Sequence, residues 1–253
     1  RRVLFRSVSF FYKTYYMKYT EFEATMSRER MKRYLDAVDG NTSKAMTLYR
    51  DNLHLSQEVF TIVNCFEVAL RNAIDKQMTQ LFGTDWLRDA IAPGGIFDNP
   101  KMKESKDQIQ KAYNKLVQQK EYKHSKLLSS MNMGTWKYMY ANVQYRACNK
   151  CLLKVFPNKP ISSAECNYNN SYIFNELDKV NTLRNRIAHH EPICFTHASK
   201  TVDTSYILNE YQKIQTLFLW MGIDSRALLY GLDHVQAVCK KINELAPDRF
   251  DDY

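Results

Sequence analysis

The sequence predicts an all-α helical bundle. Only 7 of its 253 residues are glycine and 6 are proline, and this scarcity favours long helices over a turn-rich β-sandwich. Apolar residues recur at helical spacing along most of the chain, and they make up 45% of it, which is enough for one sizeable core. The sequence contains no strand pattern and no internal repeat, so we expect a single bundle.

The chain opens on RRVLFRS, which resembles translated sequencing-adapter sequence. We therefore set residues 1–16 aside and expect one domain over residues 17–253, with Met17 as a candidate start. Without Arg1, Arg2 and Arg6, 33 basic residues remain against 27 acidic ones, and the net charge falls from +9 to +6. The remaining charge weakly favours an anionic partner.

In the N-terminal half, the expected helices are 27–38, a segment that begins near residue 43, 56–82 and 101–120. Ser27 is the expected N-cap of the first helix, because a side-chain oxygen there can accept from a free backbone N–H. Gly83 is expected to end the third. Residues 83–100 contain Ala-Pro-Gly-Gly and Asn-Pro, and we expect them to form a loop.

In the C-terminal half, the expected helices are 136–145, 150–155, 172–190, 204–221 and 225–245. Residues 157–170 are expected to connect two of them. The helix of 172–190 carries an apolar stripe that we expect to be buried, formed by Leu177, Val180, Leu183 and Ile187. The helices within about residues 203–245 are a candidate C-terminal extension.

Composition also excludes some classes of protein. No apolar run approaches the roughly 18 residues that cross a bilayer, and no signal peptide is visible, so we expect a cytoplasmic protein with no membrane partner. The six cysteines are expected to be reduced thiols. Cys148 and Cys151 are the close pair, but a structural zinc site needs a second pair of ligands, and none follows. We expect no metal and no cofactor.

The segment of residues 183–193, LRNRIAHHEPI, concentrates cationic and titratable side chains at a predicted helix end. Pro192 disfavours helical angles at Glu191, so the helix must stop near His190. Asn185 and His189 are four residues apart and share a face, and Arg184 lies beside them. A guanidinium, an amide and an imidazole are thereby expected near one helix C-terminus.

These groups suit the cleavage of RNA. A histidine can take the proton from a ribose 2′-hydroxyl or give one to the leaving 5′-oxygen. An arginine can hold the pentacoordinate phosphorane with two hydrogen bonds, and an asparagine can orient the phosphate or the imidazole. The simpler interpretation is a surface helix end whose cations complement the helix dipole.

The motif has a counterpart in a known family. Arg184-Asn-Arg-Ile-Ala-His189-His-Glu-Pro192 resembles the R-N-x-x-x-H signature of HEPN ribonucleases, in the form carried by the Abi-like (abortive infection) family. The blocks that agree with this family occur in the family's order over about residues 26–193. They are Met26-Ser-Arg-Glu-Arg-Met31, Tyr34-Leu35, Asp39-Gly40, Leu48-Tyr49, Asn52, Leu55-Ser56, Phe66-Glu-Val-Ala-Leu-Arg-Asn-Ala-Ile74, Phe82-Gly83, Trp86, Gly134-Thr-Trp136 and Phe156-Pro157.

The resemblance implies an HEPN-like core with additional helices, a homodimer, and a metal-independent endoribonuclease of antiphage or toxin type. Arg184 would be the motif arginine, Asn185 the polar residue after it, and His189 the acid–base group, with His190 as a neighbour. The products would carry a 2′,3′-cyclic phosphate. An antitoxin protein or a structured RNA is a candidate partner besides the RNA substrate.

The alternative function is a non-catalytic module of the same fold that binds RNA or a protein. Two other classes fit poorly. Membrane proteolysis lacks a membrane-spanning segment. A zinc hydrolase lacks an H-E-x-x-H frame or a third ligand beside His189 and His190.

A polar stripe interrupts the apolar helix of 56–82. Asn64, Glu67 and Arg71 follow helical spacing, and buried polar groups need partners. We expect Glu67 and Arg71 to hold Arg184 and His189 in position without contacting the substrate themselves. The alternative is an ordinary salt bridge between Glu67 and Arg71 that fixes helix packing.

Residues 101–126 carry eight lysines against three acidic residues, a net charge of +5, with Tyr113, Tyr122 and His124 interleaved. Lysines follow phosphates, and aromatic rings stack on unpaired bases. The segment is therefore a candidate RNA surface, or alternatively a solvated helix face. The lysines that we assign to RNA binding are Lys111, Lys115, Lys120 and Lys123.

Overall fold

A computed structural model gives the structure of residues 17–196 and 199–245. This part of the chain forms twelve α-helices and two 3-10 helices, and its one β-bridge, between Phe195 and Val202, does not extend into a strand. The prediction of an all-α fold is confirmed. The segment of residues 1–16 that we set aside lies outside the described residues.

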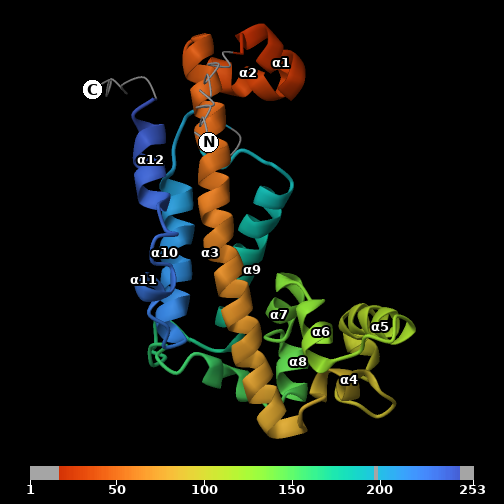
Figure 1. Ribbon diagram of the computed structural model, residues 1–253. Helices are drawn as coiled ribbons and strands as arrows, with labels where there is room; N and C mark the ends of the chain where they lie inside the picture. Colours follow the sequence, from red (N-terminus) through yellow and green to blue (C-terminus); the bar gives the residue numbers. More distant parts are fainter. Residues whose placement is uncertain (1–16, 197–198, 246–253) are drawn as a thin grey trace, which may run out of the picture.

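One long helix, α3 (Thr42–Phe82), forms the spine of the molecule (Figure 1). Its 41 residues span about 60 Å at 1.5 Å per residue. Asn41 caps its start by accepting from the Lys44 N–H at 3.0 Å, and Gly83, with φ 90°, ends it. The expected helices from residue 43 and over 56–82 are wrong as separate elements. Ser56 is not a cap, because its hydroxyl donates back to the Asn52 carbonyl at 2.9 Å inside the continuing helix.

Two short helices cover the N-terminal end of α3, namely α1 (Tyr19–Met26) and α2 (Arg28–Asp36) (Figure 1). Ser27 caps α2 as expected, since its side chain accepts from the Arg30 N–H at 3.3 Å. Buried aromatic rings join these helices to α3, with the centroids of Tyr34 and Tyr49 at 5.1 Å. The helix α1 was not predicted from the sequence.

A group of short helices packs at the C-terminal end of α3 (Figure 1). In chain order they are α4 (Trp86–Ile91), η1 (Pro100–Met102), α5 (Lys103–Gln118), α6 (His124–Ser129), α7 (Met133–Tyr138), α8 (Asn142–Ala147) and η2 (Cys151–Val155). The prediction of a loop over 83–100 is wrong where α4 forms. This helix forms because Trp86 is buried and donates from Nε1 to Asp75 of α3 at 2.8 Å. The expected helix of 136–145 is two helices, because Ala141 is extended, with ψ 146°.

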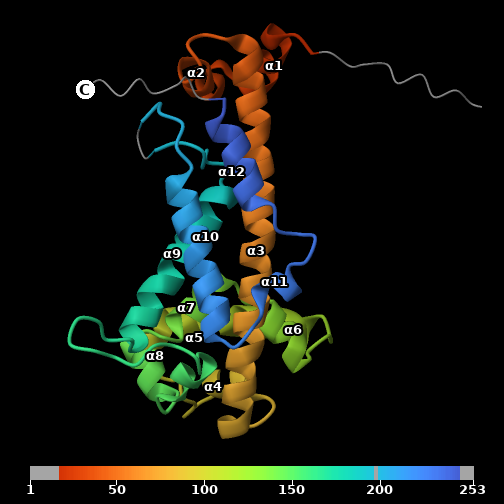
Figure 2. The same ribbon diagram turned by 90° about the vertical axis from the view of Figure 1, so that its left-hand side faces the viewer.

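The remaining helices run along α3 (Figures 1 and 2). They are α9 (Asn170–Ala188), α10 (Ser205–Trp220), α11 (Ser225–Leu228) and α12 (Val235–Asn243). The predictions for α9 and α10 are confirmed to within two residues. The expected single helix of 225–245 is wrong, because the chain turns between α11 and α12 at Gly231, which has φ 73°.

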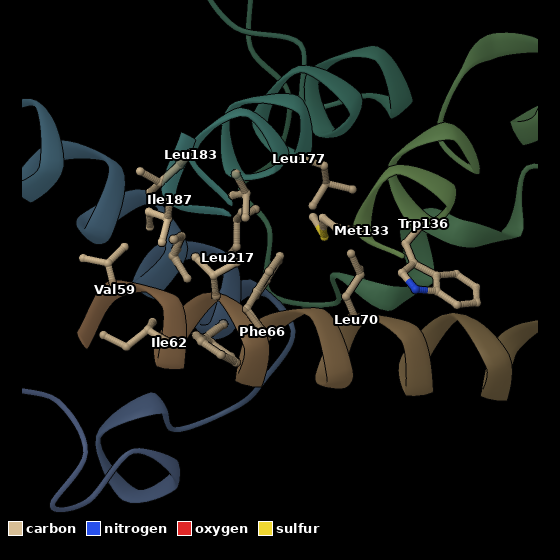
Figure 3. Packing of buried hydrophobic residues seen from close by; sticks show 14 of the residues in the cluster. Val59, Ile62, Phe66, Leu70, Met133, Trp136, Leu177, Leu183, Ile187 and Leu217 are labelled. Atoms are coloured by element: carbon tan, nitrogen blue, oxygen red, sulfur yellow. The ribbon is translucent and has the colours of Figure 1, made fainter. Parts of the chain in front are cut away.

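The core that orients α9 lies where α3, α7 and α9 meet (Figure 3). Leu70 of α3 faces Met133 of α7 and Leu177 of α9, and all three are fully buried. The predicted stripe along α9 is confirmed as buried. This packing turns the neighbouring face of α9, which carries Arg184, toward α3.

Candidate functional site

The helix α9 ends in a backbone motif that turns the chain. His189 is its C-cap, and His190 adopts a left-handed conformation with φ 57°. The His190 N–H donates to the Ile187 carbonyl at 3.0 Å, and the Glu191 N–H donates to the Arg186 carbonyl at 2.9 Å. This pair of bonds defines a Schellman motif, in which glycine usually takes the left-handed position. A side chain there costs about 1–2 kcal/mol, so His190 is held in a strained conformation.

Arg184 and His189 lie in different surroundings. Positions five apart on a helix differ by about 140° around its axis. Arg184 is half-buried, and its Nε atom is buried without a hydrogen-bond partner among the described residues. His189 is exposed, as are Asn185 and His190. In the described part of one chain, no hydrogen bond joins the Arg184 guanidinium to the His189 ring.

The residues that approach Arg184 come from α3 and α7. Burial raises the pKa of the Glu67 carboxyl, while the charges of Arg184 and Arg71 and a hydrogen bond from the Met133 N–H act in the opposite direction. The structure thus brings Glu67 and Arg71 to Arg184, as the polar stripe of α3 predicted. Their functional role stays a prediction.

Glu67 and Arg71 do not form the simple salt bridge of the alternative interpretation. Among the described residues, neither Arg71 nor Arg184 makes a direct ion pair with a carboxylate. Arg71 instead donates from Nε to its neighbour Asn72 at 3.4 Å. Two half-buried guanidinium groups therefore share the field of one carboxylate.

Two further arginines, for which no role was predicted from the sequence, hold the turn after α9. Arg186 donates from Nε to the Glu191 carboxylate at 3.2 Å and from Nη2 to the Pro192 carbonyl at 3.3 Å. The spacing of Arg186 and Glu191 was a local signal for this contact. Arg30 of α2 donates from Nη1 to the His190 carbonyl at 3.0 Å. No sequence signal points to this contact, because 160 positions separate the two residues.

The candidate RNA surface divides into two classes of lysine. Three of its lysines are held in ion pairs with carboxylates: Lys103 with Asp107, Lys106 with Asp98, and Lys126 with Glu121. The four that we assign to RNA binding are exposed on α5 and the turn after it, and none makes an ion pair among the described residues. They are Lys111, Lys115, Lys120 and Lys123.

The aromatic residues of this segment are not free to stack on bases, which corrects the expectation for them. Tyr113 and Tyr122 pack edge to face with centroids at 5.2 Å. The Tyr122 hydroxyl donates to Asp85 at 2.6 Å, and Nε2 of His124 lies 2.8 Å from Asp75. These side chains anchor the segment to α3 and α4, so the basic surface consists of lysines.

A cleft of about 1120 Å³ lies elsewhere, between α10, α11 and α12. Tyr211 and Gln215 of α10 both donate to Asp233 on its wall, at 2.7 Å and 3.3 Å. Burial, together with this bond, raises the pKa of Tyr211 to about 12. The cleft contains none of the residues predicted for catalysis or RNA binding.

The cysteines are all free thiols. Cys148 and Cys151 are buried, and burial raises the pKa of both thiols. Within residues 17–196 and 199–245, no group of three or more His, Cys, Asp or Glu side chains is arranged to hold a metal ion. No helix in the same ranges combines the length and the hydropathy that crossing a membrane requires.

One comparison with known proteins identifies a family. A family model described as Abi-like protein matches residues 4–194. This match covers more than half of the chain, from α1 through α9 and the turn after it. No curated protein and no solved structure matches the chain. The order of sequence blocks and the family match lead to one conclusion: this chain belongs to the Abi-like protein family.

Proposed function

We propose that this protein is a metal-independent endoribonuclease that acts in abortive-infection defence or as a toxin. The observation that carries the proposal is the Arg184–Asn185–His189 motif, which lies at the end of α9 within the segment matched by the Abi-like family. The motif supplies one permanently charged donor and one imidazole, a group that can accept or donate a proton.

The proposed reaction uses the RNA as its own nucleophile. His189 accepts the proton of a ribose 2′-hydroxyl, the 2′-oxygen attacks the adjacent phosphorus, and the bond to the 5′-oxygen breaks. A second histidine protonates this leaving oxygen. The products are a 2′,3′-cyclic phosphate and a 5′-hydroxyl, and no water or metal ion enters this step.

Arg184 is proposed to neutralise the charge that builds on the phosphorane. Its Nε atom has no hydrogen-bond partner among the described residues, and a buried donor without a partner costs about 1–3 kcal/mol. The terminal nitrogens of the same guanidinium make no hydrogen bond among the described residues and would bind a phosphate oxygen. Glu67 and Arg71 would hold the guanidinium in place from the α3 side.

A homodimer provides the second histidine of the proposed reaction. Each chain carries one motif histidine, so two subunits supply a base and an acid across a twofold axis. The dimer also accounts for the separate surroundings of Arg184 and His189 in one chain, because the two groups can then meet across the subunit boundary. His190 is the alternative source of the second imidazole.

The experiment is RNA cleavage in EDTA by the wild type, by His189→Ala and by His54→Ala. His54 is an exposed histidine on α3 and serves as the matched control. We expect the wild type and His54→Ala to cleave equally and His189→Ala to lose at least about a hundredfold in rate, the scale of a lost acid–base group.

Two outcomes would contradict the nuclease. Cleavage that persists in His189→Ala would show that another group does the chemistry. RNA binding without cleavage by the wild type would support the alternative, a non-catalytic module that binds RNA or a protein.

We also propose that Lys111, Lys115, Lys120 and Lys123 contact the phosphates of the RNA. Alanine at all four positions should reduce the slope of log affinity against log salt by about 2–3 for a single strand, at about 0.7 per phosphate contact. The matched control replaces Lys103, Lys106 and Lys126, whose charges are already paired. If the quadruple variant and the triple control gave the same salt dependence, the proposed contacts between these four lysines and RNA would be refuted.

A further inference from the structure

A long-range hydrogen bond joins α2 to the turn after α9 at the candidate site. Arg30 lies in the first turn of α2, where the Ser27 side chain accepts its backbone N–H. Its Nη1 atom donates to the His190 carbonyl at 3.0 Å. The donor is charged, which strengthens a hydrogen bond relative to a neutral one, although the bond lies at the exposed surface.

The residue that Arg30 holds is the strained one. His190 keeps a left-handed backbone, with φ 57°, although it is not glycine. Such conformations persist only where the surrounding structure imposes them, and they concentrate at functional sites. The Schellman bonds impose it from the α9 side, and the Arg30 bond imposes it from the α2 side.

His189 lies between these two restraints. On one side, its own N–H donates to the Asn185 carbonyl at 2.9 Å, the last helical bond of α9. On the other side, the next carbonyl is the one that Arg30 binds. The backbone that carries the His189 imidazole is therefore fixed in direction, although the ring itself is exposed.

We infer that Arg30 is a positioning residue for His189: it acts through the His190 carbonyl and aims the imidazole at the RNA. This inference rests on the proposed nuclease function. Arg30 itself need not touch the substrate. Loss of Arg30 should therefore lower the rate of the chemical step, because a misplacement of about 1 Å in a catalytic group can cost about a hundredfold in rate.

The same helix offers a matched control. Arg33 lies one turn further along α2 and also binds the chain after α9. Its Nη2 donates to the Thr196 carbonyl at 3.0 Å and its Nε to the Ser199 carbonyl at 2.9 Å, and its guanidinium lies 4.3 Å from the Phe195 ring centroid. Arg33 thus anchors the later part of the turn and leaves the His190 carbonyl to Arg30.

The test compares Arg30→Ala, Arg30→Lys and Arg33→Ala with the wild type in single-turnover cleavage, together with KM and Tm. We expect Arg30→Ala to lower the cleavage rate at saturating RNA by about 10- to 100-fold with KM nearly unchanged. Arg30→Lys should recover most of the rate, because an ammonium can donate to the same carbonyl. Arg33→Ala should lower Tm more than Arg30→Ala does and leave the rate within about threefold of the wild type.

A second readout does not depend on cleavage. The imidazole Cε1–H resonances of His189 and His190, assigned with His189→Ala, should move in Arg30→Ala and stay in place in Arg33→Ala. Unmoved resonances, or equal loss of rate in Arg30→Ala and Arg33→Ala, would overturn the positioning role. A wild type that does not cleave RNA would contradict the proposed nuclease, while the resonances would still decide whether Arg30 positions His189.

Discussion

The Glu67 carboxylate of α3 lies in the field of the Arg184 guanidinium of α9 without forming a direct ion pair with it. Burial raises the pKa of Glu67, and the Arg184 charge, together with that of Arg71, only partly offsets this shift. The half-buried carboxylate in its charged form therefore lowers the stability of the fold. A costly group beside the motif arginine suggests a role in the site rather than in packing.

Replacing Glu67 with glutamine tests this role. The raised pKa means that the folded state holds the proton more tightly than the unfolded state. The cost of the charged carboxyl is thus absent well below its ordinary value of 4.5 and appears as pH rises above it. We expect Glu67→Gln to match the wild type in unfolding free energy in acid and to equal or exceed it at neutral pH, while cleavage falls about tenfold.

The control for this prediction is Glu104→Gln, on the exposed side of α5. It should change neither the pH dependence of unfolding nor cleavage. A lower Tm for Glu67→Gln at neutral pH with intact cleavage would mean that the carboxylate serves packing alone.

Asn52 ties the segment after the histidines to α3, and its loss should destabilise the fold. Its buried Oδ1 accepts from the N–H groups of Ile193 and Cys194, at 2.9 Å and 3.2 Å. Asn52→Leu leaves two buried donors without a partner, at about 1–3 kcal/mol each. We expect the urea midpoint to fall with an unchanged m-value. Asn72→Leu, at an exposed position of the same helix, should leave the midpoint in place; a similar fall in both variants would contradict this assignment.

Asp75 should matter for stability and not for cleavage. Nε1 of Trp86 and Nε2 of His124 each lie 2.8 Å from the same carboxylate oxygen. Asp75→Ala should cost about 2–4 kcal/mol, since it removes both contacts from partly buried groups, and thermal unfolding followed by tryptophan fluorescence would measure it. Asp107→Ala, at an exposed position on α5, is the control. Loss of cleavage in folded Asp75→Ala protein would show that this cluster acts in the reaction.

Glycine at position 190 should separate stability from function. Relief of about 1–2 kcal/mol of left-handed strain exceeds the extra unfolded-chain entropy of glycine, about 0.4–1 kcal/mol, so we expect His190→Gly to gain about 0.5–1 kcal/mol in unfolding free energy. Cleavage should fall, because the turn that aims His189 becomes free to relax. Lys150→Gly, at another left-handed position with φ 55°, should gain similar stability at full activity. A lower free energy of unfolding for His190→Gly than for the wild type would contradict the claim that His190 is strained.

Local signals in the sequence predicted much of the fold. Ser27 and Gly83 mark helix ends that the structure confirms, because capping chemistry is local. The buried stripe of α9 followed from helical spacing alone. The prediction failed where tertiary contacts decide the structure. Ser56 was the expected start of a separate helix and lies inside α3, and Trp86 forms a short helix in an expected loop because it packs against α3.

At the candidate site, too, local features were predictable from the sequence and most tertiary contacts were not. The end of α9 near His190 was predictable from Pro192, and the nearness of Glu67 to Arg184 from the polar stripe of α3. The Arg30 contact was not predictable, because it joins residues 160 positions apart. The aromatic residues near the basic surface were misread, because sequence spacing does not show that Tyr122 bonds to Asp85.

The most direct test of the central claim is the chemistry of the cut ends. RNA incubated in EDTA with the wild type, with Arg184→Ala and with His189→Ala is treated with polynucleotide kinase, without prior phosphatase. We expect 5′-hydroxyl ends that label at once and 2′,3′-cyclic phosphates on the other fragment, from the wild type alone. Wild-type products with 5′-phosphate ends, or equal products from either variant, would contradict it.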